Sequence, residues 1–141
     1  MQPRIAGMQR VYTEPDPFEP FAISQAVAVG GWLFVSGQAA LDQEGAVVGQ
    51  GDFRQQAECA FASLERVLKA GGSGLEDVVK VTLFLTDMRH LPEVVELRRR
   101  FFRPPYPADS IVEVNALALP DLMFEIEAIA VIGAGAGKST S

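Results

Sequence analysis

The chain has 141 residues, of which 48% are hydrophobic and 21% charged, and this length and composition predict one globular domain. A formal net charge of −6 argues against a nucleic-acid-binding protein, because contacts to phosphate dominate the affinity of that class. A single cysteine excludes an intrachain disulfide, and one cysteine with one histidine does not make a usual metal site.

The sequence carries no sign of a membrane or secretory segment. No apolar run is long enough to span a bilayer, and the first residues lack the apolar stretch of a signal peptide. We therefore expect a cytoplasmic protein that has neither a membrane nor a nucleic acid as its partner.

The N-terminal part predicts an arm followed by a hairpin. Residues 1–21 are rich in proline and show little periodicity, which predicts an arm lying on the surface. Two short apolar runs flank Gly30 and Gly31 in "AVAVGGWLFVSGQ", residues 26–38, and predict a β-hairpin. The turn-rich residues 41–52 allow one further short edge strand, at residues 46–48.

A helix is predicted to begin after Asp52. This residue is suited to the N-cap position, and Gln55 follows three residues later. Gly71 and Gly72 are suited to end the helix. Apolar residues recur between these limits with helical spacing, namely Ala57, Ala60, Phe61, Leu64, Val67 and Leu68.

The C-terminal half alternates strand and helix patterns. Residues 77–87 alternate as a strand, residues 90–102 form a second helix pattern, and residues 109–117 and 123–132 predict two final strands. The order β-β-(β)-α-β-α-β-β predicts an α+β fold with two helices packed on one face of a mixed sheet. The last residues, 133–141, predict a flexible Gly/Ser-rich tail, because Ile132 stands where a phosphate-binding loop needs glycine.

Several blocks of the chain together resemble the reactive intermediate deaminase (Rid, or YjgF-like) family. They are "ISQAVAVGGWLFVSGQ", "GDFRQQAECAFASLERVLKAGG", "DVVKVTLFLTDM" and "FEIEAIAV", within a domain at residues 22–132. The resemblance implies a chorismate-mutase-like fold and a homotrimer with clefts between its subunits. It also implies hydrolysis of imines or enamines to a 2-keto acid and ammonia, with no metal and no cofactor.

In that family an arginine binds the substrate carboxylate and a glutamate helps to position the attacking water. Ser36, Gly37 and Glu125 match the family pattern. Four other cleft positions depart from it: Asp109 replaces the arginine, Ile23 an aromatic residue, Val95 an asparagine and Ile111 a cysteine.

Replacing the arginine by Asp109 reverses a charge. Charges about 4 Å apart interact by about 4 kcal/mol at an effective dielectric constant near 20, so a substrate carboxylate beside Asp109 would be repelled. Arg103, six residues upstream, is a candidate to replace the lost arginine. With Ile23, Val95 and Ile111 the cleft is also more apolar, which suits a larger and less charged ligand.

Two interpretations of Asp109 remain open. It can face the cleft as an acid/base partner of Glu125, since two carboxylates in an apolar pocket can divide into one acid and one base. Alternatively it only caps the turn after Pro107. Glu125 can likewise be a solvent-side charge, and Ser36 can serve only to satisfy backbone groups.

Two functions are compatible with these residues. The first is a Rid-like enzyme, with Glu125 and Asp109 as catalytic groups, that acts on an imine, an enamine or a related reactive intermediate, as a step of a specialised biosynthetic or catabolic pathway. Its substrate would differ from the standard 2-imino acids. The alternative is a non-catalytic trimer that binds a small molecule or regulates a partner enzyme.

Overall fold

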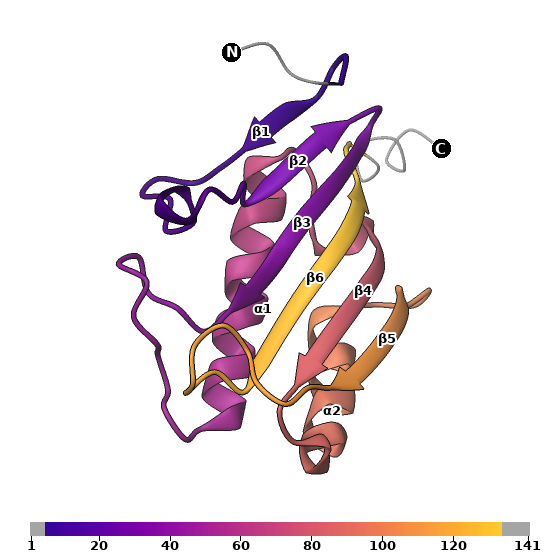
Figure 1. Cartoon of the computed structure of the whole chain (residues 1–141). Coiled ribbons are helices and arrows are strands. Elements are labelled where there is room, and N and C mark those ends of the chain that lie inside the picture. Colours follow the sequence, from indigo (N-terminus) through magenta and orange to yellow (C-terminus); the bar gives the residue numbers. More distant parts are fainter. Residues whose placement is uncertain (1–4, 134–141) are drawn as a thin grey trace.

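The computed structural model describes residues 5–133 of the chain (Figure 1). Most of the predicted C-terminal tail, residues 134–141, and the first four residues of the arm lie outside this range. The strands and α-helices are β1 (Gln9–Val11), β2 (Ala26–Val29), β3 (Trp32–Ala39), α1 (Phe53–Ala70), β4 (Val78–Leu85), α2 (Leu91–Phe101), β5 (Ala108–Glu113) and β6 (Phe124–Val131).

The strands form one six-stranded sheet in the order β1-β2-β3-β6-β4-β5. All neighbours are antiparallel except β4 and β5, which are parallel and are connected through α2. Both helices lie against the same face of this sheet (Figure 1). The α+β architecture with two helices on one face of a mixed sheet is therefore confirmed.

The first helix and the first hairpin form for the local reasons that the sequence suggests. The carboxylate of Asp52 accepts a hydrogen bond from the backbone N–H of Gln55, at 3.0 Å, and so caps the start of α1. Gly30 and Gly31 both have positive φ, 59° and 82°, as a two-residue hairpin turn between β2 and β3 requires.

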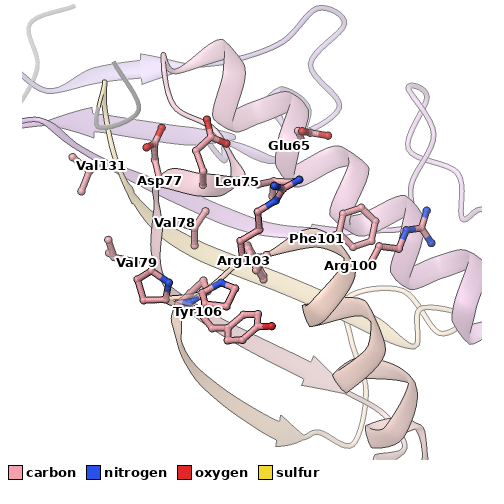
Figure 2. A pocket seen from close by; sticks show the side chains of 15 residues that line it. Glu65, Leu75, Asp77, Val78, Val79, Arg100, Phe101, Arg103, Tyr106 and Val131 are labelled. Atoms are coloured by element: carbon pink, nitrogen blue, oxygen red, sulfur yellow. The ribbon is translucent and has the colours of Figure 1, made fainter. Parts of the chain in front are cut away.

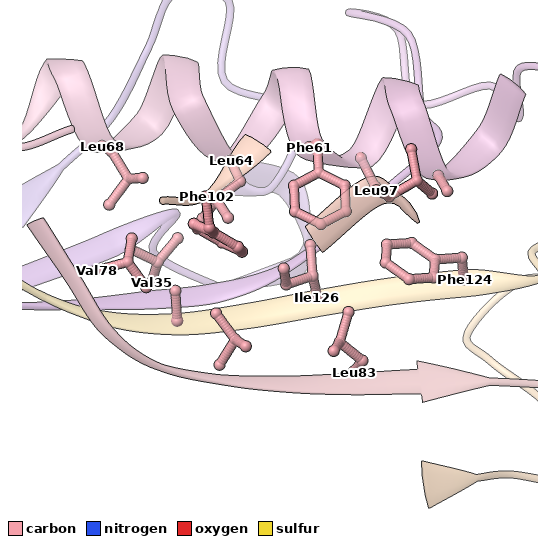
Figure 3. Packing of buried hydrophobic residues seen from close by; sticks show 14 of the residues in the cluster. Val35, Phe61, Leu64, Leu68, Val78, Leu83, Leu97, Phe102, Phe124 and Ile126 are labelled. Atoms are coloured by element: carbon pink, nitrogen blue, oxygen red, sulfur yellow. The ribbon is translucent and has the colours of Figure 1, made fainter. Parts of the chain in front are cut away.

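The hydrophobic core lies between the helices and the sheet (Figure 3). The rings of Phe61 in α1 and Phe124 in β6 approach to 5.9 Å between centroids, and Phe102, just after α2, packs edge-on against Phe61. Alternate residues of β4 and β6 point into this core, so their remaining residues point to the other face.

That other face, which we call the open face, is uncovered and carries exposed apolar side chains beside charged ones such as Lys80 and Glu127. Trp32 and Phe34 of β3 and Val112 of β5 are 44%, 45% and 41% exposed. No helix of residues 5–133 lies over them, because α1 and α2 both pack on the opposite side (Figure 1). Exposed large apolar side chains on an uncovered sheet face are typical of an interaction surface.

Two details differ from the sequence-based prediction. Residues 9–11, within the predicted arm, form the edge strand β1, which pairs with β2. Residues 46–48 form no strand, because Leu41 and Val47 make only an isolated bridge. No helix among residues 5–133 combines the length and the apolar character needed to cross a bilayer.

Candidate functional site

Glu125 and Gly37 meet at an irregularity between β3 and β6. Val35 pairs with Ala128 and Gln38 pairs with Ile126, so two residues of β3 stand opposite one of β6, which is a β-bulge. A Cβ atom added to Gly37 would lie 2.6 Å from Cδ and 2.7 Å from Oε2 of Glu125. The carboxylate therefore lies directly against the glycine, and a larger residue at position 37 would require the Glu125 side chain to move.

Ser36 ties this bulge to the segment that precedes β2. Its hydroxyl donates a hydrogen bond to the carbonyl of Ser24, at 2.7 Å, and its N–H donates to the carbonyl of Gln25, at 2.9 Å. Ile23, which is 47% exposed, directly precedes this anchored segment. Ser36 thus satisfies backbone groups, as one of the two interpretations predicted, and in doing so fixes the chain beside Ile23.

The environment of Glu125 changes its acidity. Partial burial raises the pKa of the Glu125 carboxyl above its ordinary value, and the negative charge of Glu127 on the same strand raises it further. A carboxyl group of this kind keeps its proton closer to neutral pH, which favours a role in proton transfer.

Asp109 forms an ion pair that the sequence did not suggest. Arg98 of α2 donates from Nε to Oδ2 and from its terminal NH2 group to Oδ1, both at 2.8 Å. The two side chains are 25% and 19% exposed, so the pair lies at the surface and is partly accessible to solvent. Neither carboxylate oxygen accepts a hydrogen bond from the backbone within residues 5–133, so the structure offers no turn cap at this position.

The Arg98–Asp109 pair borders a cavity of about 390 Å³. We call it the α2–β5 cavity. The cavity is also lined by Val95 and Ile111, two further residues at which the chain departs from the family pattern. Its complete lining consists of Val95, Arg98, Arg99, Phe102, Tyr106, Pro107, Asp109 and Ile111.

Within one chain, Asp109 and Glu125 lie on opposite faces of the sheet. Asp109 pairs with Val81, which points into the core under the helices. Glu125 pairs with Phe84, three residues further along the same strand and hence on the open face. The two carboxylates therefore do not form an acid/base pair within one chain.

Arg103 lies apart from the α2–β5 cavity. It lines a second cavity of about 590 Å³ on the other side of the loop that follows α2. Figure 2 shows its guanidinium group pointing away from Tyr106, toward the end of that cavity where Leu75 and Glu65 lie. The arginine near Asp109 is thus Arg98 rather than Arg103.

Sequence reasoning missed Arg98 because no local pattern marks it. It stands in a run of three arginines, Arg98, Arg99 and Arg100, which resembles a solvated helix face. Its position one turn after Val95 on α2 is the only available signal, since residues three apart share a helix face.

Among residues 5–133, no group of three or more His, Cys, Asp or Glu side chains is arranged to hold a metal ion.

Comparison with known proteins agrees with the fold. The family model described as endoribonuclease L-PSP matches residues 12–132. A RutC family protein of Pyrococcus abyssi is 36% identical over 122 residues, which cover 85% of this chain and 94% of the relative. The 2-iminobutanoate/2-iminopropanoate deaminase of Dermatophagoides farinae is 36% identical over 118 residues, 84% of this chain and 90% of the relative.

A solved structure gives the same result. RidA from the Antarctic bacterium Psychrobacter sp. PAMC 21119 is 34% identical and superposes with a TM-score of 0.80, covering 88% of this chain and 99% of RidA. The molecule is thus an α+β protein of the Rid type. The chain belongs to the endoribonuclease L-PSP family, which includes the RutC and RidA proteins, and the resemblance to the Rid family is confirmed.

Proposed function

We propose that this protein hydrolyses a reactive imine, or the enamine in equilibrium with it, in a cleft formed between two copies of the chain. The observation that carries the proposal is the carboxylate of Glu125, which is partly buried and held against Gly37 in the β3 bulge. A relative that covers most of this chain is named a 2-iminobutanoate/2-iminopropanoate deaminase, which supports the same reaction class.

Glu125 is suited to move the protons of this reaction. Its carboxylate takes a proton from water as the water oxygen attacks the imine carbon, and a carbinolamine forms. The protonated carboxyl gives this proton to the imine nitrogen, which completes the carbinolamine. The carboxylate then transfers the hydroxyl proton of the carbinolamine to the same nitrogen as the C–N bond breaks and the C=O bond forms, so one imine and one water yield one carbonyl compound and one ammonia.

The site needs a second copy because its two parts face away from each other. Glu125, with Gly37 against it, lies on the open face, whereas Val95, Asp109 and Ile111 border the α2–β5 cavity on the other side of the sheet. A contact between two different surfaces of successive copies repeats head to tail and closes into a ring. We propose a homotrimer, whose assembly would also cover the exposed apolar residues of the open face.

The α2–β5 cavity favours a substrate with a sizeable apolar part. Val95, Ile111, Phe102 and Tyr106 give it apolar walls, and its volume of about 390 Å³ exceeds the needs of a very small imino acid. We propose a positioning role for Asp109 in place of the acid/base role, because its carboxylate is bound by Arg98.

Removal of the Glu125 carboxylate tests the proposed reaction. An amino-acid oxidase supplies imines from leucine or methionine, and semicarbazide traps those that are not hydrolysed. The Glu125→Gln variant should lose about a hundredfold or more of the hydrolysis rate, whereas Glu127→Gln on the same strand should stay close to the wild type. Equal rates in the wild type and Glu125→Gln would refute the assignment.

The alternative function, a binding or regulatory trimer, is favoured by the departures at Asp109, Ile23, Val95 and Ile111. In that case small ligands would raise the melting temperature of the protein, and no imine would be hydrolysed faster than without the protein.

Although the name of the family model refers to an endoribonuclease, the net charge of −6 gives an RNA substrate little support.

A further inference from the structure

The cavity of about 590 Å³ beside Arg103 has no part in the proposed reaction. We call it the Arg103 cavity. Its walls come from α1, from the segment that leads into β4, from the end of α2 and from the loop at residues 102–107. Phe102, Tyr106 and Pro107 line both this cavity and the α2–β5 cavity, so the two lie on either side of one loop. Its volume is sufficient for a small metabolite.

Arg103 brings an unpaired positive charge into this cavity. Its guanidinium group makes no ion pair with any residue between 5 and 133. Figure 2 shows it pointing toward the end of the cavity where Leu75 and Glu65 lie. Since a guanidinium group offers five N–H donors in a planar fork, it is suited to bind the carboxylate of a ligand through two of them.

Acidic side chains line the same end of the cavity. Figure 2 shows Glu65 and Asp77 on the side toward which the Arg103 guanidinium points, and Tyr106 on the other side. Asp77 is only 6% exposed, so its charge is screened less by water and salt than a surface charge. The carboxylates at this end are suited to accept hydrogen bonds from an ammonium group of a ligand.

The charge balance of the lining disfavours a simple anion. The arginines Arg100 and Arg103 contribute two positive charges, and Glu65, Glu76 and Asp77 contribute three negative charges, which leaves a formal charge of −1. The charge of Arg100 is also compensated outside the cavity, because Arg100 pairs with Glu58. A ligand that carries both a carboxylate and an ammonium group therefore matches this lining better than an anion does.

The remainder of the lining is apolar and accessible. Val79 and Tyr106 are 41% and 50% exposed, and prolines of the loop lie beside them. The ring of Phe101 stacks on that of Phe61, with 4.5 Å between the centroids, so this wall is held in a fixed position. Rings of this kind favour contact with an aromatic side chain of a ligand.

We propose that the Arg103 cavity binds an α-amino acid with an aromatic side chain. Its carboxylate accepts hydrogen bonds from Arg103, its ammonium group donates to Glu65 and Asp77, and its ring contacts Tyr106 and Val79. This second site goes beyond the proposed function, because it requires neither Glu125 nor the α2–β5 cavity. A zwitterion satisfies both signs of charge at one end of the cavity, whereas an anion or an amine alone satisfies one.

The test compares three ligands by isothermal titration calorimetry. L-Phenylalanine carries both charges, 3-phenylpropanoate lacks the ammonium group and 2-phenylethylamine lacks the carboxylate. The wild type should bind L-phenylalanine about tenfold or more tighter than either of the others, which corresponds to the loss of one charge-assisted contact in each. Added salt should weaken the binding of L-phenylalanine.

Variants of Arg103 locate the carboxylate of the ligand. Arg103→Gln should weaken L-phenylalanine by about tenfold or more without weakening 2-phenylethylamine. Arg103→Lys keeps the charge without the fork and should fall between the wild type and Arg103→Gln. Because Arg103 makes no ion pair within residues 5–133, Arg103→Gln should leave the melting temperature of the ligand-free protein unchanged, which separates a lost contact from a lost fold.

Two further variants distinguish the two cavities. Arg99→Gln is the matched control, since Arg99 lines the α2–β5 cavity but not the Arg103 cavity. Val95→Trp fills the α2–β5 cavity from its own wall. Both variants should bind L-phenylalanine as the wild type does, and so should Glu125→Gln.

Three results would overturn the proposal. The first is that the wild type binds no L-phenylalanine at millimolar concentration, or binds 3-phenylpropanoate or 2-phenylethylamine as tightly. The second is unchanged binding of L-phenylalanine after Arg103→Gln. The third is binding that Val95→Trp abolishes, because the amino acid would then occupy the α2–β5 cavity. The trapping assay tests the proposed reaction separately, so a failure of one proposal is not a failure of the other.

Discussion

Gly37 is the residue at which the smallest chemical change should disturb the site. A methyl group there would overlap the carboxylate of Glu125, with Cδ only 2.6 Å from the new Cβ atom. We expect Gly37→Ala to displace Glu125, to lower imine hydrolysis strongly and to cost about 1–3 kcal/mol of unfolding free energy. Chemical denaturation and the trapping assay measure the two effects.

The double variant Gly37→Ala/Glu125→Ala isolates the cause. Without the long side chain at position 125, the added methyl group has space, so the two changes should not be additive in stability. If the double variant lost the full sum of the two single losses, the contact between Gly37 and Glu125 would not be the origin of the effect.

The raised pKa of Glu125 predicts how stability depends on pH. Between the ordinary value of 4.5 and the raised folded-state pKa, the folded chain holds a proton that the unfolded chain has lost. This carboxyl therefore lowers the free energy of unfolding as pH rises through that interval, and Glu125→Gln lacks the effect. The stability of the wild type relative to Glu125→Gln should fall with increasing pH above about 4.5, in denaturation series at matched pH. A rise instead would contradict a raised pKa.

At the residue scale, the contact of Glu125 with Gly37 agrees with the resemblance, which had pointed to Ser36, Gly37 and Glu125. That these residues form a catalytic site stays a prediction. The role of Asp109 could not be deduced, because its partner Arg98 is 11 residues away on a different element. A contact between a helix and an edge strand depends on their packing, which no local pattern encodes.

At the scale of single elements, α1 depends on its first residue. Asp52 caps the helix through the N–H of Gln55, so Asp52→Ala should cost about 1 kcal/mol of unfolding free energy. Asp52→Asn keeps an acceptor at the same position and should cost less. Denaturation at a fixed chain concentration measures both, and an Ala variant as stable as the wild type would exclude the cap as a stabilising contact.

Elements with a clear period were predictable from the sequence, and short elements were not. The apolar spacing of α1 and the alternation of β4 and β6 follow directly from burial on one face. The strand β1 has only three residues, of which Gln9 and Arg10 are exposed, so it shows no apolar pattern. Its existence depends on backbone pairing with β2, a contact between residues distant in the sequence.

At the scale of the whole molecule, the two halves of the proposed site require an assembly. The exposed apolar side chains of Trp32, Phe34 and Val112 on the open face offer a surface that such an assembly could cover. Sedimentation should show a species of about three times the 15.2 kDa chain mass. A Trp32→Glu variant should sediment as smaller species and lose imine hydrolysis together with the assembly.

The most direct test of a site shared between copies mixes two inactive variants. Glu125→Gln removes the proton-transfer group, and Val95→Trp fills the α2–β5 cavity on the other side of the sheet. When the two variants are unfolded and refolded together, some clefts take Glu125 from a Val95→Trp chain and Val95 from a Glu125→Gln chain. Such clefts contain both native residues and should be active. Random assembly should restore about a quarter of wild-type imine hydrolysis. Activity that stays at the level of the separate variants, although the chains form mixed oligomers, would contradict a cleft built from two copies.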